Sequence, residues 1–281
     1  MAVDLHTHSS YSDGSDAPAE LVAAAARARL EAVALTDHDN LDGIPEAIDA
    51  ADRLGVELIP GVELSCRWER GGFHLIVLWL EPGPGPLQDR LAELQAGRAT
   101  RNEHMVERLA GLGIDITYAE VVEEAGGTGV GRPHMAAVLV RKGVVESMSE
   151  AFDSYLAAGR PGYVGRVRLS PEDAIGLARA SGGVPVVAHP HTLGIFRSEL
   201  DTELKRLAGL GLGGVETYYP EYEPDTRLEL VERTRQAGLI PSGGSDYHGS
   251  YKQGLRIGSG YGDLAVERSV LEELRADRRR R

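Results

Sequence analysis

The sequence contains one cysteine, Cys66, which excludes an internal disulfide and fits a reducing compartment. A membrane-spanning helix needs about 20 consecutive uncharged apolar residues, and no run in this sequence approaches that length. It is also short of positive charge: a net charge of −13 argues against general binding of duplex nucleic acid or anionic membranes. A strand expected almost at the N-terminus leaves no room for a signal peptide. We therefore expect a cytoplasmic protein.

Apolar residues are abundant, and their spacing indicates an α/β fold. The 281 residues are 42% hydrophobic, enough for one large domain or a domain with an insertion. Short apolar strands alternate with helices, which predicts parallel β/α architecture. The expected strands are Val3–Leu5, Ala32–Leu35, Val56–Ile59, Phe73–Leu80, Pro185–Ala188, Gly214–Thr217 and Leu239–Pro241. The expected helices between them are Pro18–Leu30, Ile44–Leu54, Pro171–Ala180, Leu200–Leu210 and Thr226–Ala237.

The alternation is interrupted in the middle of the chain. From Leu87 to Tyr163 helical patterns dominate and no clear strand is evident. We interpret residues 87–163 as a helical subdomain inserted into a barrel formed by residues 1–86 and 164–281. The closing run Arg278–Arg281 is expected to be a frayed, solvated tail.

Side chains that can bind metal ions follow the predicted strands. His6 and His8 are two residues apart, so on a strand they point to the same face. Alone, this pair fits a surface strand with two solvated histidines equally well. The arrangement recurs, however, and functional groups of parallel β/α folds collect at the C-terminal ends of strands. The candidates are His6, His8, Asp13, His38, Glu63, His74, His189, Asp246 and His248.

One candidate does not follow the strand rule. His74 comes at the beginning of its expected strand, and a hairpin through residues 70–72 would account for this. The acids beside His38, Asp37 and Asp39, are interpreted as partners that orient histidines, with solvated loop acids as the alternative.

The nature of the candidates indicates the kind of site. Nitrogen and oxygen ligands suit Zn, Mn or Fe, and the lack of thiolates argues against a structural zinc site. The candidates are too many for one ion, so two or three divalent ions are expected. Three carboxylates do not neutralise the charge of two or three divalent ions. The remaining positive charge suits a bridging hydroxide and a phosphate, as in phosphoryl transfer. A single ion would allow amide or ester hydrolysis instead.

The helical segment carries a further candidate site. In Gly129-Val-Gly-Arg-Pro-His134 a loop leads into a helix, and backbone N–H groups at a helix start favour an anion together with Arg132. An ordinary capped turn with a solvated arginine is the alternative.

Taken together, five motifs resemble those of the PHP (polymerase and histidinol phosphatase) family. They are Asp4-Leu-His-Thr-His-Ser, Leu35-Thr-Asp-His-Asp, Gly61-Val-Glu, Ala188-His-Pro and Gly244-Ser-Asp-Tyr-His. They run in the family's order over nearly the whole chain. The insertion with Arg132 and His134 resembles the branch of nucleoside 3′,5′-bisphosphate phosphatases and 5′-to-3′ exoribonucleases. The resemblance implies a distorted (β/α)7 TIM-like barrel with a trinuclear site of Mn, Fe or Zn.

The resemblance also implies a role for each candidate. The first ion would be held by His6, His8, Glu63 and Asp246. The second ion would be held by Asp13, His38 and His248. Glu63 would bridge to a third ion held with His74 and His189. Arg132 and His134 would bind the substrate phosphate or assist the leaving group. The branch often has Gly-Arg after Ala-His-Pro, whereas His191-Thr192 stands here. This departure concerns the substrate, with His191 at a possible phosphate-binding position, and not the metal site.

We therefore expect a phosphoesterase in which a metal-bridging hydroxide attacks a terminal phosphate. The expected substrate is a phosphorylated small molecule, either a nucleotide or a short oligonucleotide. One alternative is a histidinol-phosphate-type phosphatase, against which the helical insertion speaks. A second is a non-catalytic PHP module, which would be expected to have lost ligands. A third is amide hydrolysis, but amidohydrolases commonly use a modified lysine, and Lys142, Lys205 and Lys252 follow no predicted strand.

Overall fold

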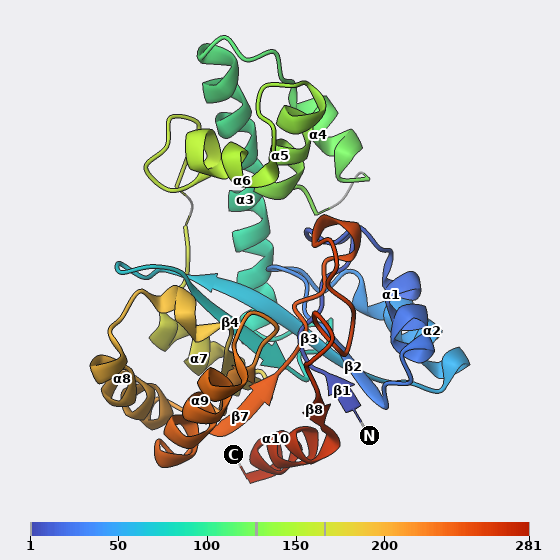
Figure 1. Cartoon of the computed structure of the whole chain (residues 1–281), viewed down its shortest axis with the longest axis vertical. Coiled ribbons are helices and arrows are strands. Elements are labelled where there is room, and N and C mark those ends of the chain that lie inside the picture. Colours follow the sequence, from blue (N-terminus) through green and yellow to red (C-terminus); the bar gives the residue numbers. More distant parts are fainter. Residues whose placement is uncertain (1, 127–128, 166, 281) are drawn as a thin grey trace.

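A computed structural model describes residues 2–126, 129–165 and 167–280. Within these ranges, eight strands form a nearly closed barrel in the order β7-β6-β5-β4-β3-β2-β1-β8, with helices around it (Figure 1). The strands are β1 (Ala2–Asp4), β2 (Ala32–Leu35), β3 (Glu57–Cys66), β4 (Phe73–Leu78), β5 (Val184–Val187), β6 (Gly214–Tyr218), β7 (Ile240–Gly243) and β8 (Val266–Glu267). The barrel helices are α1 (Pro18–Arg27), α2 (Ile44–Leu54), α7 (Pro171–Ala180), α8 (Arg197–Gly209), α9 (Pro224–Gln236) and α10 (Arg268–Arg280). The predicted TIM-like barrel is confirmed.

Backbone hydrogen bonds beyond β1 and β7 bring the two ends of the barrel together. The Leu5 N–H donates to the Gly243 carbonyl (3.2 Å), and the Asp246 N–H donates to the His6 carbonyl (2.9 Å). The His8 N–H then donates to the Tyr247 carbonyl (2.9 Å). The segments that carry candidate ligands after β1 and β7 are therefore fixed against each other.

The barrel departs from the parallel pattern at β4. This strand pairs antiparallel with both β3 and β5, and Cys66 lies opposite Phe73 across the hairpin. The connection of residues 67–72 is too short for a parallel crossover, so it can only form a hairpin. The first residues of β4 consequently lie at the same edge as the C-terminal ends of the parallel strands. The expected hairpin is confirmed, and it accounts for the position of His74.

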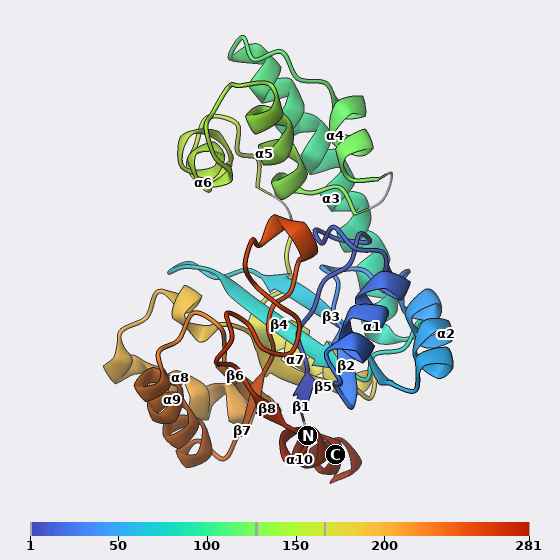
Figure 2. The ribbon, with the colours of Figure 1, turned by 45° about the vertical axis from the view of Figure 1, so that its right-hand side comes forward.

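The interior of the barrel is closed at the end away from the insertion by α10 (Figure 2). Val270, Leu271 and Leu274 of this helix belong to the same buried cluster as Val3 and Ile240. The predicted tail is solvated but not frayed: Arg278–Arg280 are exposed, yet they form the last turn of α10, and Arg278 Nε donates to the Gly182 carbonyl (2.9 Å). Arg281 lies outside the described residues.

The central segment is helical, as its sequence pattern indicates. Its elements are α3 (Pro86–Gly111), α4 (Tyr118–Glu124), α5 (Arg132–Arg141), α6 (Met148–Ala151) and the π-helical turn η1 (Phe152–Leu156). They enclose a core of their own, which includes Met105, Leu109 and Leu139. The first half of α3 packs on the barrel instead, through Leu87 and Leu91.

No helix in the described ranges is both long and apolar enough to cross a membrane.

Candidate metal centre

The predicted candidates lie at one end of the barrel. Each is placed by the strand before it or by the strand that carries it. His6 and His8 follow β1, His38 follows β2 and His189 follows β5. Glu63 and His74 lie within β3 and β4, on the two arms of the hairpin. The remaining candidates, Asp13, Asp246 and His248, come from the loops after β1 and β7.

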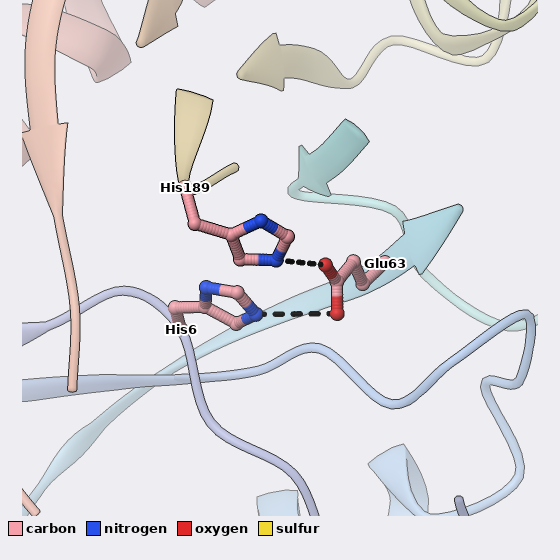
Figure 3. Close-up of side chains that lie close together, drawn as sticks. All are labelled: His6, Glu63 and His189. Atoms are coloured by element: carbon pink, nitrogen blue, oxygen red, sulfur yellow. Dashed lines mark hydrogen bonds and ion pairs between the residues drawn. The ribbon is translucent and has the colours of Figure 1, made fainter. Parts of the chain in front are cut away.

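Glu63 lies at the centre of the cluster and divides its two oxygens between two groups of histidines. Its side chain is 1% exposed. The ring nitrogens facing Oε2 are His6 Nε2 (3.2 Å), His8 Nε2 (3.1 Å) and His38 Nδ1 (3.3 Å). Those facing Oε1 are His74 Nδ1 (2.8 Å) and His189 Nε2 (3.1 Å). Figure 3 shows His6 and His189 on opposite oxygens of the carboxylate.

The other two carboxylates extend the cluster on either side of His8. Asp246 Oδ1 lies 3.4 Å from the Nε2 atoms of both His6 and His8. Asp13 Oδ1 lies 3.6 Å from His8 Nδ1 and 3.3 Å from His248 Nε2. Asp13 Oδ2 lies 3.6 Å from His38 Nε2. Among the described residues, four overlapping groups of three potential ligands occur; His8 belongs to three of them, and His6 and Glu63 belong to two each.

Hydrogen bonds at the back of two rings determine which nitrogen carries the proton. His6 Nδ1 lies 2.9 Å from Glu216 Oε1, so Nδ1–H donates to the carboxylate. His248 Nδ1 lies 2.8 Å from the backbone carbonyl of Asp246, which only accepts. In the neutral rings the lone pair is therefore on Nε2, directed at other acceptors. His6 Nε2 and His8 Nε2 are only 3.0 Å apart, so at most one proton lies between them.

The close packing of histidines and carboxylates shifts the pKa values of several members of the cluster. Burial favours the neutral ring of His8, but Asp246 and Glu63 outweigh it and raise its pKa to about 9. Burial also opposes the charge of Glu63, yet His38 and His6 hold its pKa well below its usual range. At His38, burial prevails and lowers the pKa to about 3, despite Glu63 and Asp13.

These residues fit a metal centre. Buried lone pairs of histidines and carboxylates converge on the same points, an arrangement that cations between them would stabilise. In the described ranges, His38 Nδ1 is buried without a hydrogen-bond partner of good geometry. Nitrogen and oxygen donors without thiolates suit divalent transition metals. The geometry and the donor types support the predicted ability of this cluster to bind metal ions; they do not identify the metal.

Comparison with known proteins shows the family to which the chain belongs. A model of the PHP domain matches residues 4–114. The chain is 32% identical over 275 residues to the 3′,5′-nucleoside bisphosphate phosphatase of Chromobacterium violaceum, covering 98% of this chain and 96% of that protein. It is 34% identical over 247 residues to the 5′-3′ exoribonuclease Rnm of Salmonella typhimurium, covering 87% and 84%. The chain belongs to the PHP family.

A solved structure supports the membership. A Bifidobacterium adolescentis protein described as a metal-dependent phosphoesterase is 30% identical, with a TM-score of 0.85 and coverage of 98% of this chain and 96% of that one. The predicted PHP resemblance is confirmed, and with it the class of enzyme, a hydrolase of phosphate esters.

Three residues of this PHP site were missed by the sequence analysis. Glu216, in β6, holds His6 and also accepts the His189 backbone N–H at Oε2 (2.6 Å). Asp246 Oδ2 accepts from the Tyr219 hydroxyl (2.9 Å) and pairs with Lys252 Nζ. The signal for Glu216 was a lone carboxylate inside an apolar strand. Lys252 has no such signal, because the fold of the loop after β7 brings it back to Asp246.

The two acids beside His38 are not solvated, so that alternative is wrong. Asp37 and Asp39 are 2% and 1% exposed. Asp37 accepts from the Ser9 N–H (2.8 Å) and from the Ser12 hydroxyl (2.6 Å). Ser12 Oγ in turn lies 3.3 Å from His8 Nδ1, so Asp37 acts on His8 through Ser12. Asp39 pairs with Arg98 of α3 (3.0 Å).

The three predicted substrate-binding residues each have hydrogen-bond partners of their own. Arg132 donates to the Leu156 carbonyl (3.3 Å), and its guanidinium lies 5.5 Å from the Phe152 ring centre, within the insertion. His134 is buried, and its Nδ1 accepts the Gly131 N–H (3.1 Å), which leaves the proton on Nε2. His191 Nδ1 lies 2.8 Å from the Tyr222 hydroxyl. The roles of these three residues stay predictions.

Proposed function

We propose that this PHP enzyme hydrolyses a terminal phosphate of a nucleotide, either a nucleoside 3′,5′-bisphosphate or the 5′ end of a short RNA. The observation that carries the proposal is Glu63, whose two oxygens face different groups of histidines 2.8–3.3 Å away. A carboxylate shared in this way suits closely spaced cations, which are suited to phosphoryl transfer. The activities named for the two relatives support a nucleotide as the substrate.

We assign the ligands of two or three divalent ions from the groups around Glu63. One set comprises His6, His8, Glu63 and Asp246, whose ligand atoms lie 3.0–3.4 Å from their neighbours. A second comprises Asp13, His38 and His248, with Asp13 between the two rings. A third comprises Glu63, His74 and His189. Mn, Fe or Zn suits these donors.

The bound ions would lower the pKa of a water nucleophile and neutralise the phosphate. The chain's own residues orient the ligands: Glu216 keeps the lone pair of His6 on Nε2, and Tyr219 and Lys252 hold the second oxygen of Asp246. Burial lowers the pKa of His134, which favours its neutral Nε2–H form. His134 then assists the leaving oxygen as a hydrogen-bond donor, and Arg132 balances charge on the substrate.

We also propose that residues 87–163 act as a subdomain of the active site. Gly129 has φ +62°, and a Cβ there would lie 2.5 Å from the Ser12 carbonyl oxygen. This close approach brings the loop before α5 against the segment that carries Asp13. Glycine is suited to such a position because it adopts positive φ without strain and leaves room for the neighbouring backbone.

The test is phosphate release from adenosine 3′,5′-bisphosphate with added Mn²⁺, repeated after chelation. Fast release that chelation abolishes supports the proposal and leads to short 5′-phosphorylated RNA as the next substrate. Protein that contains metal but releases no phosphate from either substrate would refute a nucleotide substrate while leaving the metal site in place.

A further inference from the structure

A cavity of about 270 Å³ adjoins the proposed metal centre on the side of His38. His38 lines it, and the ring of His38 also lies 3.3 Å from Glu63. The other lining residues come from the loops after β1 and β2, from the helices α3 and α4, and from the loop before α5. Those used in the argument are Tyr11, Asn40, Gln95, Arg98, Asn102 and Tyr118. A substrate phosphate at the metal centre therefore has this cavity next to it.

The wall between the barrel and α3 is held by hydrogen bonds. Gln95 Nε2 donates to Asn40 Oδ1 (3.1 Å), and Asn40 Nδ2 donates to the Tyr11 carbonyl (2.8 Å). Arg98 pairs with Asp39 (3.0 Å). These contacts tie α3 to both barrel loops, so the cavity is formed before a ligand enters. Preformed cavities are typical of sites for small molecules.

The chemistry of the lining suits an uncharged ring system. The charge of Arg98 is matched by Asp39, and Asp42 contributes a further negative charge to the lining. The cavity therefore has no excess of positive charge for a second phosphate. Tyr11 and Tyr118 are half-buried and offer aromatic surface, on which any nucleobase stacks.

Asn102 adds a polar group that lacks a partner. Its Nδ2 donates to the Val130 carbonyl (2.8 Å), which fixes the orientation of the amide. Its Oδ1 is buried, and in the described part of the chain it accepts no hydrogen bond. Asn102 lines the cavity, so its fixed amide contributes a polar group to the wall.

We propose that this cavity holds the base of the nucleotide and thereby makes the enzyme prefer nucleotides to simple phosphate esters. The inference rests on the proposed function and assigns the insertion a role in it, because α3 and α4 supply Gln95, Asn102 and Tyr118. The phosphate is bound at the metal centre, while the base lies between the barrel loops and the insertion.

Equilibrium binding separates the base from the phosphate. Mn²⁺-loaded protein is titrated with adenosine 5′-monophosphate and with ribose 5-phosphate, which has no base. We expect the wild type to bind the nucleotide at least about tenfold more tightly, a modest return for a stacked base. Tyr118→Ala removes this advantage and leaves the affinity for ribose 5-phosphate within about twofold. Tyr118→Phe keeps the ring and restores it.

Tyr261→Ala is the matched control, since Tyr261 is 54% exposed and does not line the cavity. Equal affinity of the wild type for the two ligands would overturn the inference. So would a Tyr118→Ala variant that retains the preference, or one that loses affinity for both ligands equally. Because the readout is the ratio of two affinities and not phosphate release, the result is distinct from phosphate release from adenosine 3′,5′-bisphosphate, which tests the proposed function.

Discussion

Replacing Glu216 with glutamine tests whether this buried carboxylate prepares His6 for metal binding. Glu216 is 1% exposed and accepts two hydrogen bonds, from His6 Nδ1–H (2.9 Å) and from the His189 backbone N–H (2.6 Å). A glutamine has one acceptor oxygen in place of two. If that oxygen stays on the His189 N–H, its amino group faces His6 Nδ1.

The consequence is a change of tautomer. His6 Nδ1 must then accept a hydrogen bond, so the proton moves to Nε2, which faces His8 Nε2 at 3.0 Å and Glu63 Oε2 at 3.2 Å. If the amide turns the other way, its amino group opposes the His189 N–H. Loss of such an orienting partner typically weakens metal binding about 10- to 100-fold, or about 1.4–2.7 kcal/mol.

The assay is competition for Mn²⁺ or Zn²⁺ against a chromogenic chelator, with the metal content per chain measured in parallel. Glu223→Gln is the control, because it removes the same charge from an exposed position near the start of α9. We expect weaker binding in Glu216→Gln alone. An affinity within twofold of the wild type, in a folded Glu216→Gln protein, would refute the role given to Glu216.

Four further predictions follow from the geometry. His38→Ala should lose metal and most phosphatase activity; normal metal content and rate would remove His38 from the ligands. Arg132→Ala should mainly raise the Michaelis constant, and an unchanged constant would count against substrate binding. In metal-free protein the pKa of His8 is raised from 6.5 to about 9. This shift stabilises the fold by on the order of 3 kcal/mol below pH 6.5, and the stabilisation is lost as the pH rises through 9. The melting temperature should therefore fall from pH 6.5 to 8.5 with chelator, and added metal should suppress the fall. Leu271→Ala in α10 should cost about 2–5 kcal/mol in chemical denaturation, and a cost below 1 kcal/mol would mean that α10 does not close the barrel.

The sequence is informative about this fold where local pattern and burial agree. The helix Ile44–Leu54 was predicted with its observed bounds, since proline near its start and Gly55 after it mark both ends. Ala32–Leu35 was likewise predicted as observed, as an apolar strand. The strand carrying Glu63 is longer than expected, because β3 continues through the site to pair with β4.

The misses have a common physical origin in contacts between distant segments. The arginine-rich end of α10 resembles a solvated tail in composition, and only the closed barrel shows why its other face is buried. Lys252 reaches Asp246 through the fold of the loop that connects them. The candidate ligands and their order along the chain are visible in the sequence, whereas the partners that orient them depend on packing.

The dual membership of α3 in two cores has a consequence for local unfolding. Its first half is buried with the barrel through Leu87 and Leu91, and its second half is buried with the insertion through Met105 and Leu109. Partial melting of the insertion would therefore fray α3 from its C-terminal end, toward Asn102 and Gln95, before it disturbed the barrel. Hydrogen exchange of the α3 amides would then report how readily the cavity proposed for the base opens, while the amides near the proposed metal ligands stay protected.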